Sequence, residues 1–186
     1  MRHEVRFSGF GGQGIILSAV ILGRAAVMYD NKFAVQTQVY GPEARGGASM
    51  SALIIDDDPI LFPKVVTPGI FVIMSQEGFE KYGADAPASA VMLVDSTLVH
   101  SRPKCTCIEI PATREAKQSL GKDIVANIVM LGALVASTHV VTETALEKAI
   151  LDSVPKGTET LNIKAMKKGI ELAESTGHTG NAGSSA

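Results

Sequence analysis

The chain opens with a short apolar run that leads directly into a glycine-rich turn and then into a long apolar segment. The run is Val5–Ser8, the turn reads GFGGQG over residues 9–14, and the apolar segment is Ile15–Met28. A strand, a tight turn and a helix in this order favour an α/β fold. The pattern GxGxxG in this setting is typical of a turn that binds phosphate at a helix N-terminus. A tight turn that binds nothing is the second interpretation of the same residues.

Strand-like and helix-like segments alternate along the rest of the chain. The expected strands are Val5–Ser8, Phe33–Val39, Ser49–Ile55, Ile70–Met74, Val91–Val94 and Thr106–Ile110. The expected helices are Ile15–Met28, Glu77–Tyr82, Thr113–Leu120, Ile124–Thr138, Glu143–Ser153 and Glu159–Ser175, with Thr142 and Thr158 as N-caps. The alternation predicts a Rossmann-like three-layer α/β domain with a mostly parallel sheet. No helix is expected between Phe33 and Ile55, which leaves room for an antiparallel portion.

Length and composition exclude several classes of protein. The 186 residues fit one α/β domain, expected over 1–175, and the small polar end at 176–186 is expected to be a flexible tail. Charged residues make up 19% with a net charge of -2, so neither nucleic acid nor an anionic membrane is an expected partner. The longest apolar stretch, Ile124–Ala136, is shorter than the about 20 residues that span a bilayer. No secretory signal precedes the first strand, and we expect a cytoplasmic protein.

The two cysteines do not predict a metal centre. Cys105 and Cys107 would point to the same face of one strand, where a mutual disulfide is poorly accommodated. A zinc site or an iron–sulfur cluster needs about four ligands, which these cysteines and four scattered histidines do not readily supply. We therefore expect two reduced thiols in a reducing compartment and no metal on this chain.

The glycine turn by itself suggests a nicotinamide or flavin enzyme, but one required element is missing. A dinucleotide site uses an acidic residue at the end of the second strand to bind the ribose. The expected strand Phe33–Val39 ends without one, and Asp30 stands at its wrong end. Gln13 inside the turn would also compete with a dinucleotide for space. A stand-alone NAD- or flavin-binding oxidoreductase is therefore the alternative, not the preferred interpretation.

A second glycine-rich stretch reads YGPEARGG over residues 40–47. It combines a rigid turn at Gly41-Pro42, an acid–base pair formed by Glu43 and Arg45, and the flexible pair Gly46-Gly47. These residue types predict a loop, and a charged loop between strands is typical of a binding segment. An exposed turn with solvated charges is the other interpretation.

The two glycine-rich stretches in this order resemble the gamma subunit, or gamma domain, of 2-oxoacid:ferredoxin oxidoreductases. The resemblance covers residues 3 to 175. Further similar segments are Met74–Glu77, Val94–Ser96, Ile110–Thr113 and Ala126–Leu134. The chain departs from the pattern at Ala44, where relatives often have a larger residue such as methionine.

The resemblance implies a subunit of a hetero-oligomeric enzyme that decarboxylates a 2-oxoacid with coenzyme A. The products are acyl-CoA, carbon dioxide and reduced ferredoxin or flavodoxin. In that family, thiamine diphosphate, magnesium and the iron–sulfur clusters belong to the alpha, beta and delta subunits. We therefore expect this chain to carry no catalytic residue and to be inactive alone. Its turn resembles the 2-oxoglutarate and branched-chain members of the family, and of these two substrates 2-oxoglutarate is the one we prefer.

The resemblance also suggests a ligand for the glycine turn, the diphosphate of coenzyme A. Free N–H groups at a helix N-terminus attract phosphate, and an arginine can clamp it. The candidate phosphate-binding residues are Gly9, Gly11, Gly12, Gln13, Gly14 and Arg45. The candidate interface or substrate-side loop consists of Tyr40, Gly41, Pro42, Glu43, Gly46 and Gly47. A purely structural subunit, in which both stretches only shape an interface, is a third interpretation.

Overall fold

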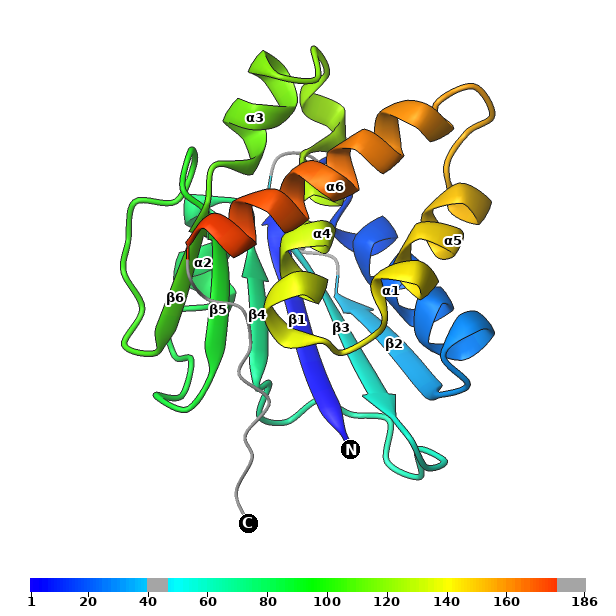
Figure 1. Cartoon of the computed structure of the whole chain (residues 1–186). Helices are drawn as coiled ribbons and strands as arrows, with labels where there is room; N and C mark the ends of the chain where they lie inside the picture. The colour runs from blue at the N-terminus through cyan, green and yellow to red at the C-terminus, as the bar shows by residue number, and fades with distance from the viewer. Residues whose placement is uncertain (40–46, 177–186) are drawn as a thin grey trace.

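The structure, a computed structural model, describes residues 1–39 and 47–176 as one six-stranded sheet between two layers of helices (Figure 1). The strands are β1 (His3–Phe10), β2 (Phe33–Val39), β3 (Ala48–Asp56), β4 (Ile70–Ile73), β5 (Val91–Asp95) and β6 (Thr106–Ile110). The α-helices are α1 (Ile15–Tyr29), α2 (Gln76–Tyr82), α3 (Ala112–Gln118), α4 (Ala126–Thr138), α5 (Glu143–Ser153) and α6 (Glu159–Ser175). A short 3-10 helix, η1 (Asp123–Val125), precedes α4.

The strand order is β2-β3-β1-β4-β5-β6. The four strands β1, β4, β5 and β6 are parallel, whereas β3 is antiparallel to both β1 and β2. The predicted three-layer α/β fold is confirmed, and the antiparallel portion lies where no helix was expected between consecutive strands. The expected helix Ile124–Thr138 is divided, because its first turn belongs to η1.

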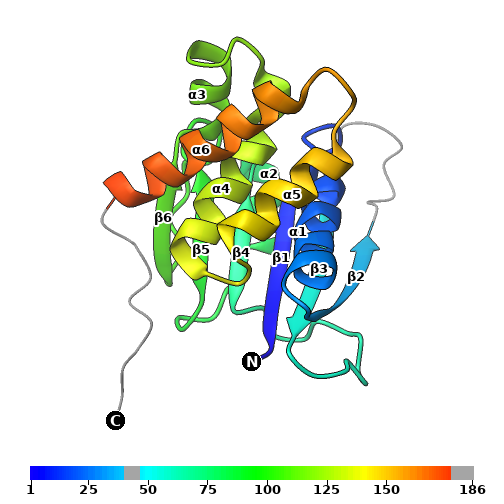
Figure 2. The same ribbon diagram turned by 45° about the vertical axis from the view of Figure 1, so that its right-hand side comes forward.

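The two faces of the sheet are covered unequally (Figure 2). Helices α1, α4, α5 and α6 cover one face, and α2 covers the other. The larger core lies under the four helices and includes Val5, Phe7 and Leu93. The smaller core lies under α2 and is built around Phe71 and Met92. Helix α4 is apolar almost all round because it is enclosed between the sheet and α6.

The two predicted N-caps differ in the structure. The Thr142 hydroxyl accepts a hydrogen bond from the N–H of Ala145 at 3.1 Å, so the cap of α5 is confirmed. Thr158 does occupy the N-cap position of α6, but its side chain makes no capping bond. Its hydroxyl instead donates to the carbonyl of Pro155 at 2.7 Å, so the predicted N-cap position is confirmed but the side-chain capping bond is not formed.

The chain leaves the sheet in opposite directions after two adjacent parallel strands. From β1 it enters α1 on one face, and from β4 it enters α2 on the other. In open α/β sheets, ligands bind at such a point, outside the carboxyl ends of the strands. The glycine turn stands at this point.

Among residues 1–39 and 47–176, no helix combines the length and apolar character that a membrane crossing requires. The expected tail at 176–186 lies, apart from Thr176, outside the described residues.

Candidate functional site

Three glycines of the GFGGQG turn are required by the chain itself. Gly12 and Gly14 have φ angles of 96° and 73°, in the left-handed region that side chains rarely adopt. A Cβ atom at Gly14 would also stand 2.4 Å from the Asn127 side chain. At Gly9, a Cβ atom would meet the Gln13 side-chain oxygen at 2.5 Å. Folding alone therefore accounts for glycine at these positions.

Gly11 is different, because nothing in the described chain requires a glycine there. It is exposed, its φ is not in the left-handed region, and a Cβ atom would have no neighbour within 4 Å. Open space therefore lies beside the backbone of this residue. A glycine without a folding reason next to open space favours a function that brings another molecule close to the backbone.

The start of α1 offers unpartnered hydrogen-bond donors. Gly14 takes the N-cap position and has no side chain, and the first turn holds no acidic residue. Within the described part of the chain, the N–H groups of Gly11, Gly12 and residues 15–17 have no hydrogen-bond acceptor. Such N–H groups at a positive helix end suit an anion.

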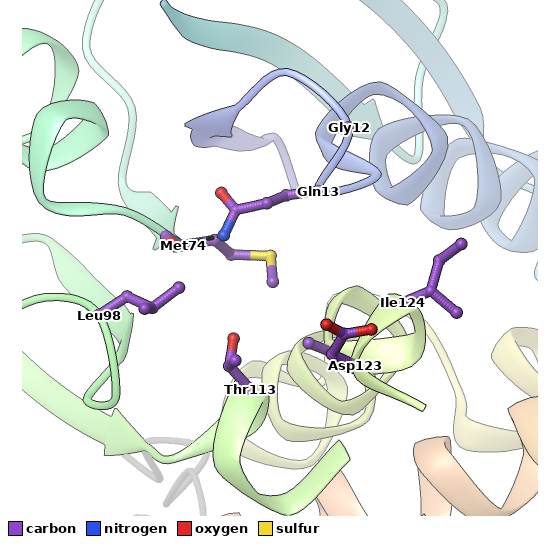
Figure 3. Close-up of a pocket in the computed structure, with 8 residues that line it drawn as sticks. Gly12, Gln13, Met74, Leu98, Thr113, Asp123 and Ile124 are labelled. Atoms are coloured by element: carbon purple, nitrogen blue, oxygen red, sulfur yellow. Dashed lines mark hydrogen bonds between the residues drawn. The ribbon is translucent and has the colours of Figure 1, made fainter. Parts of the chain in front are cut away.

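A cavity of about 390 Å³ adjoins the turn at the carboxyl ends of β1, β4 and β5 (Figure 3). Its lining consists of Gly12, Gln13, Met74, Leu98, Thr113, Asp123, Ile124 and Ala126. Figure 3 shows Thr113 and Asp123 on the side of the cavity opposite Gln13. Asp123 is the one charged side chain among these lining residues. Its carboxylate suits a ligand hydroxyl or N–H group and disfavours a phosphate at that end.

A second, apolar hollow of about 320 Å³ lies on the other side of Gly12. Leu17, Val154 and Leu161 contribute to its wall. Ile124 lines both hollows and is 75% exposed. The glycine turn and η1 therefore separate a cavity with a mixed polar and apolar lining from a mainly apolar one.

Thr113 is held in place by a buried carboxylate. The Asp95 side chain, which is fully buried, accepts hydrogen bonds from the Thr113 N–H at 3.0 Å and from its hydroxyl at 2.5 Å. It also accepts from the N–H of Thr97 at 3.1 Å. The end of β5 thus fixes the first turn of α3 beside the cavity.

The structure unites only part of the predicted site. Gly12 and Gln13 line the cavity, and Gly47 lies directly before β3. The other loop candidates, Tyr40, Gly41, Pro42, Glu43, Arg45 and Gly46, lie outside the described residues. Leu98, Thr113, Asp123 and Ile124 were not predicted. Leu98 and Thr113 come soon after expected strands, and the carboxyl ends of parallel strands meet on one side of a sheet. Asp123 and Ile124 follow α3 and had no such signal.

The position of β2 bears on the nicotinamide interpretation. In a dinucleotide fold, the second strand lies next to the first and brings its acidic residue to the glycine turn. Here β3 and β4 are the neighbours of β1, and β2 lies at the edge beyond β3. The carboxyl end of β2 is therefore one strand further from the turn than a ribose-binding acid would need to be.

The described residues offer no obvious metal site. Residues 1–39 and 47–176 contain no group of three or more His, Cys, Asp or Glu side chains that could hold an ion. Cys105 and Cys107 are both partly buried, and this burial raises the pKa of each thiol above its ordinary value. Both lie beside the smaller core, away from the residues of the cavity.

Residues 4–172 match the pyruvate ferredoxin/flavodoxin oxidoreductase family. The chain belongs to this family. Over 178 residues it is 57% identical to the 2-oxoglutarate synthase subunit KorC of Methanocaldococcus jannaschii. The aligned region covers 94% of this chain and 95% of the relative. The keto/oxoacid ferredoxin oxidoreductase gamma subunit of Geobacter sulfurreducens has a TM-score of 0.83 and 46% identity, over 93% of this chain and 99% of that one.

The fold also occurs within a longer polypeptide of the same enzyme class. The 2-oxoglutarate:ferredoxin oxidoreductase of Magnetococcus marinus, solved with 2-oxoglutarate, coenzyme A and succinyl-CoA, matches with a TM-score of 0.80. The match covers 94% of this chain but 31% of that one, and at 21% identity it shows the fold alone. The predicted membership of the oxidoreductase family is confirmed, and with it the role as part of an enzyme. These relatives do not support the alternative of a stand-alone nicotinamide or flavin enzyme.

Proposed function

We propose that this chain is the gamma subunit of a 2-oxoglutarate:ferredoxin oxidoreductase. The complex would convert 2-oxoglutarate and coenzyme A to succinyl-CoA and carbon dioxide, with two electrons passed to ferredoxin or flavodoxin. Support for the substrate comes from the KorC relatives, which match this chain over nearly its whole length. Residues 1–175 would act as one gamma-type domain, in the cytoplasm.

The chemistry of decarboxylation would take place on other chains. Alpha, beta and delta subunits would carry thiamine diphosphate with its magnesium ion and the iron–sulfur clusters. When bound, thiamine diphosphate supplies the carbanion chemistry that breaks the bond to carbon dioxide. The gamma subunit would contribute to assembly and to binding of coenzyme A.

The observation that carries the role in coenzyme A binding is the open space at Gly11. A phosphate there would meet the unpartnered N–H groups of Gly11, Gly12 and the first turn of α1. No folding constraint explains the absence of a side chain, so a ligand that approaches the backbone closely is the reason we infer. Arg45 would add a positive charge, and Gly9 and Gly14 would allow the turn its shape.

The residues on the opposite side of the cavity fit the rest of the ligand. Coenzyme A has a hydroxyl group and two amide N–H groups in its pantetheine arm, in addition to its phosphates. Asp123 can accept a hydrogen bond from such a group, and the Thr113 hydroxyl lies on the same side. The diphosphate would therefore lie at the Gly11 end, away from the Asp123 carboxylate.

The test is Gly11→Val in the assembled complex, with Gly69→Val as the matched control. Gly69 is also exposed and has open space at its Cβ position. It lies just before β4, at the amino ends of the parallel strands and therefore opposite the glycine turn. We expect Gly11→Val to raise KM for coenzyme A about tenfold, which is about 1.4 kcal/mol of lost binding. KM for 2-oxoglutarate and kcat should be unchanged. A complex that assembles normally with unchanged coenzyme A kinetics would contradict the proposal.

The substrate is tested separately, by the kcat/KM of the purified complex for 2-oxoglutarate, pyruvate and 2-oxoisovalerate. We expect the highest value for 2-oxoglutarate. A higher value for either of the other acids would overturn the substrate assignment and leave the coenzyme A proposal standing.

A further inference from the structure

The side-chain amide of Gln13 joins the glycine turn to the end of β4 (Figure 3). Its Nε2 donates to the carbonyl oxygen of Met74 at 2.9 Å, and its Oε1 accepts from the N–H of Phe10 at 2.7 Å. The backbone N–H of Gln13 also donates to the carbonyl of Phe10 at 3.2 Å. Gln13 therefore closes the turn on itself and ties it to a residue 61 positions away.

This link stands where the chain divides between the two faces of the sheet. β1 and β4 are paired up to Ser8 and Ile73, and the N–H of Met74 still donates to Ser8 at 2.8 Å. Beyond that bond, the chain turns toward α1 on one side and α2 on the other. The Gln13–Met74 bond links the two segments once more, beyond the last backbone hydrogen bond between them and after they have begun to diverge.

The link also explains part of the turn's sequence. The Gln13 oxygen occupies the space that a Cβ atom at Gly9 would need, so the two residues are matched. Both polar atoms of the Gln13 amide already have a backbone partner within the chain. Only the second Nε2 hydrogen and the second Oε1 lone pair are left, and a ligand that displaced either backbone bond would open the turn.

We propose that Gln13 is a positioning residue for coenzyme A and not one of its ligands. It holds the turn so that the unpartnered N–H groups of Gly11 and Gly12 keep one arrangement before the ligand arrives. A turn without this tether samples more conformations, and the fraction that can bind falls. The apparent affinity falls by the same fraction. This inference rests on the proposed coenzyme A contact.

The test is Gln13→Met in the complete complex. Methionine has a similar length and no hydrogen-bonding amide, so it removes both bonds with little change in volume. Gln76→Met is the matched control, because the Gln76 amide bonds Ser101 and His100 on the α2 side of the sheet. Two measurements are made: the kinetics for coenzyme A and 2-oxoglutarate, and amide hydrogen exchange of the segment 9–14 without coenzyme A.

We expect Gln13→Met to raise KM for coenzyme A about tenfold with unchanged kcat, and to speed hydrogen exchange in segment 9–14 in the free complex. The control should change neither. A raised KM with unchanged exchange would make Gln13 a direct ligand and overturn the inference. Unchanged KM in Gln13→Met while Gly11→Val raises it would also overturn the inference but leave the proposed function intact. Unchanged KM in both variants would overturn both proposals together.

Discussion

The backbone of Gly169 in α6 lies directly against the carbonyl group of Val129 in α4. A Cβ atom at residue 169 would stand 1.9 Å from that oxygen. The contact is reciprocal, since a Cβ atom at Gly132 of α4 would stand 2.1 Å from the carbonyl oxygen of Met166. These two glycines allow α4 and α6 to pack backbone to backbone, which encloses α4 between α6 and the sheet.

Gly169→Ala should therefore destabilise the protein by about 3 kcal/mol, because the added methyl group forces α6 away from α4. Helix propensity alone predicts the opposite, since alanine favours a helix over glycine by about 1 kcal/mol. Urea unfolding measures the difference. Gly69→Ala, at an open position outside the helices, is the control and should change little. Equal or higher stability of Gly169→Ala would mean that the two helices lie further apart.

Asp95→Asn should lower the free energy of unfolding by about 2 kcal/mol. The buried carboxylate accepts three hydrogen bonds from Thr97 and Thr113, and an amide would turn an N–H group toward at least one of these donors. Thr113→Ser keeps the hydroxyl and is the matched variant expected to remain near wild type. Chemical denaturation of both variants tests this. A loss in Asp95→Asn no greater than that in Thr113→Ser would contradict the role of these hydrogen bonds.

Thr142→Ala should destabilise the protein by about 1.5 kcal/mol. The Thr142 hydroxyl caps α5 and also donates to Asp30 at 2.7 Å, at the end of α1. The variant thus loses both a helix cap and a link between two helices far apart in the sequence. Thr142→Ser should retain most of the stability in a thermal unfolding measurement. A serine variant as unstable as the alanine variant would contradict the role of the hydroxyl.

The free energy of unfolding should decrease below about pH 6.5, because His3 is protonated more easily in the unfolded chain than in the folded one. Burial lowers its pKa below the ordinary 6.5, and the positive charges of Lys32 and the N-terminus act in the same direction. The unfolded chain therefore binds the proton more readily, so the stability is complete above pH 6.5 and is lost as the pH falls toward the lower folded pKa. His3→Gln should reduce this loss between pH 7 and 5, measured by urea unfolding. The exposed His100 provides the control variant His100→Gln, which should keep the wild-type slope.

The elements could be predicted closely where turn residues bound an apolar run. The ends of β2, β6, α5 and α6 lie where the sequence places them. The start of α4 could not be predicted, because the apolar pattern continues through η1 without a break and only the hydrogen bonding distinguishes the two. Local periodicity reports which side of a segment is buried, not the backbone hydrogen bonds within it.

The site could be predicted at the glycine turn and not beyond it. No pattern in the neighbouring residues marks Asp123 as a site residue. It lines the cavity only because the chain after β6 returns over the carboxyl ends of the parallel strands. From the sequence, the Gln13 side chain was expected to compete with a dinucleotide for space in the turn. In the structure the Gln13 side chain bonds to Phe10 within the turn and to Met74, which lies after another strand.

The amino-acid sequence by itself determined the strand–turn–helix unit, the α/β class and the family, because turns, helix starts and motifs depend on neighbouring residues. Only the tertiary structure decided the rest. It shows that β2 is an edge strand of the sheet and that Gln13 bonds to Met74. It also shows that, among the glycines of the turn, Gly11 alone combines open space at its Cβ position with a φ outside the left-handed region. These relationships depend on the order of strands in the sheet, which is set by packing between residues far apart in the chain.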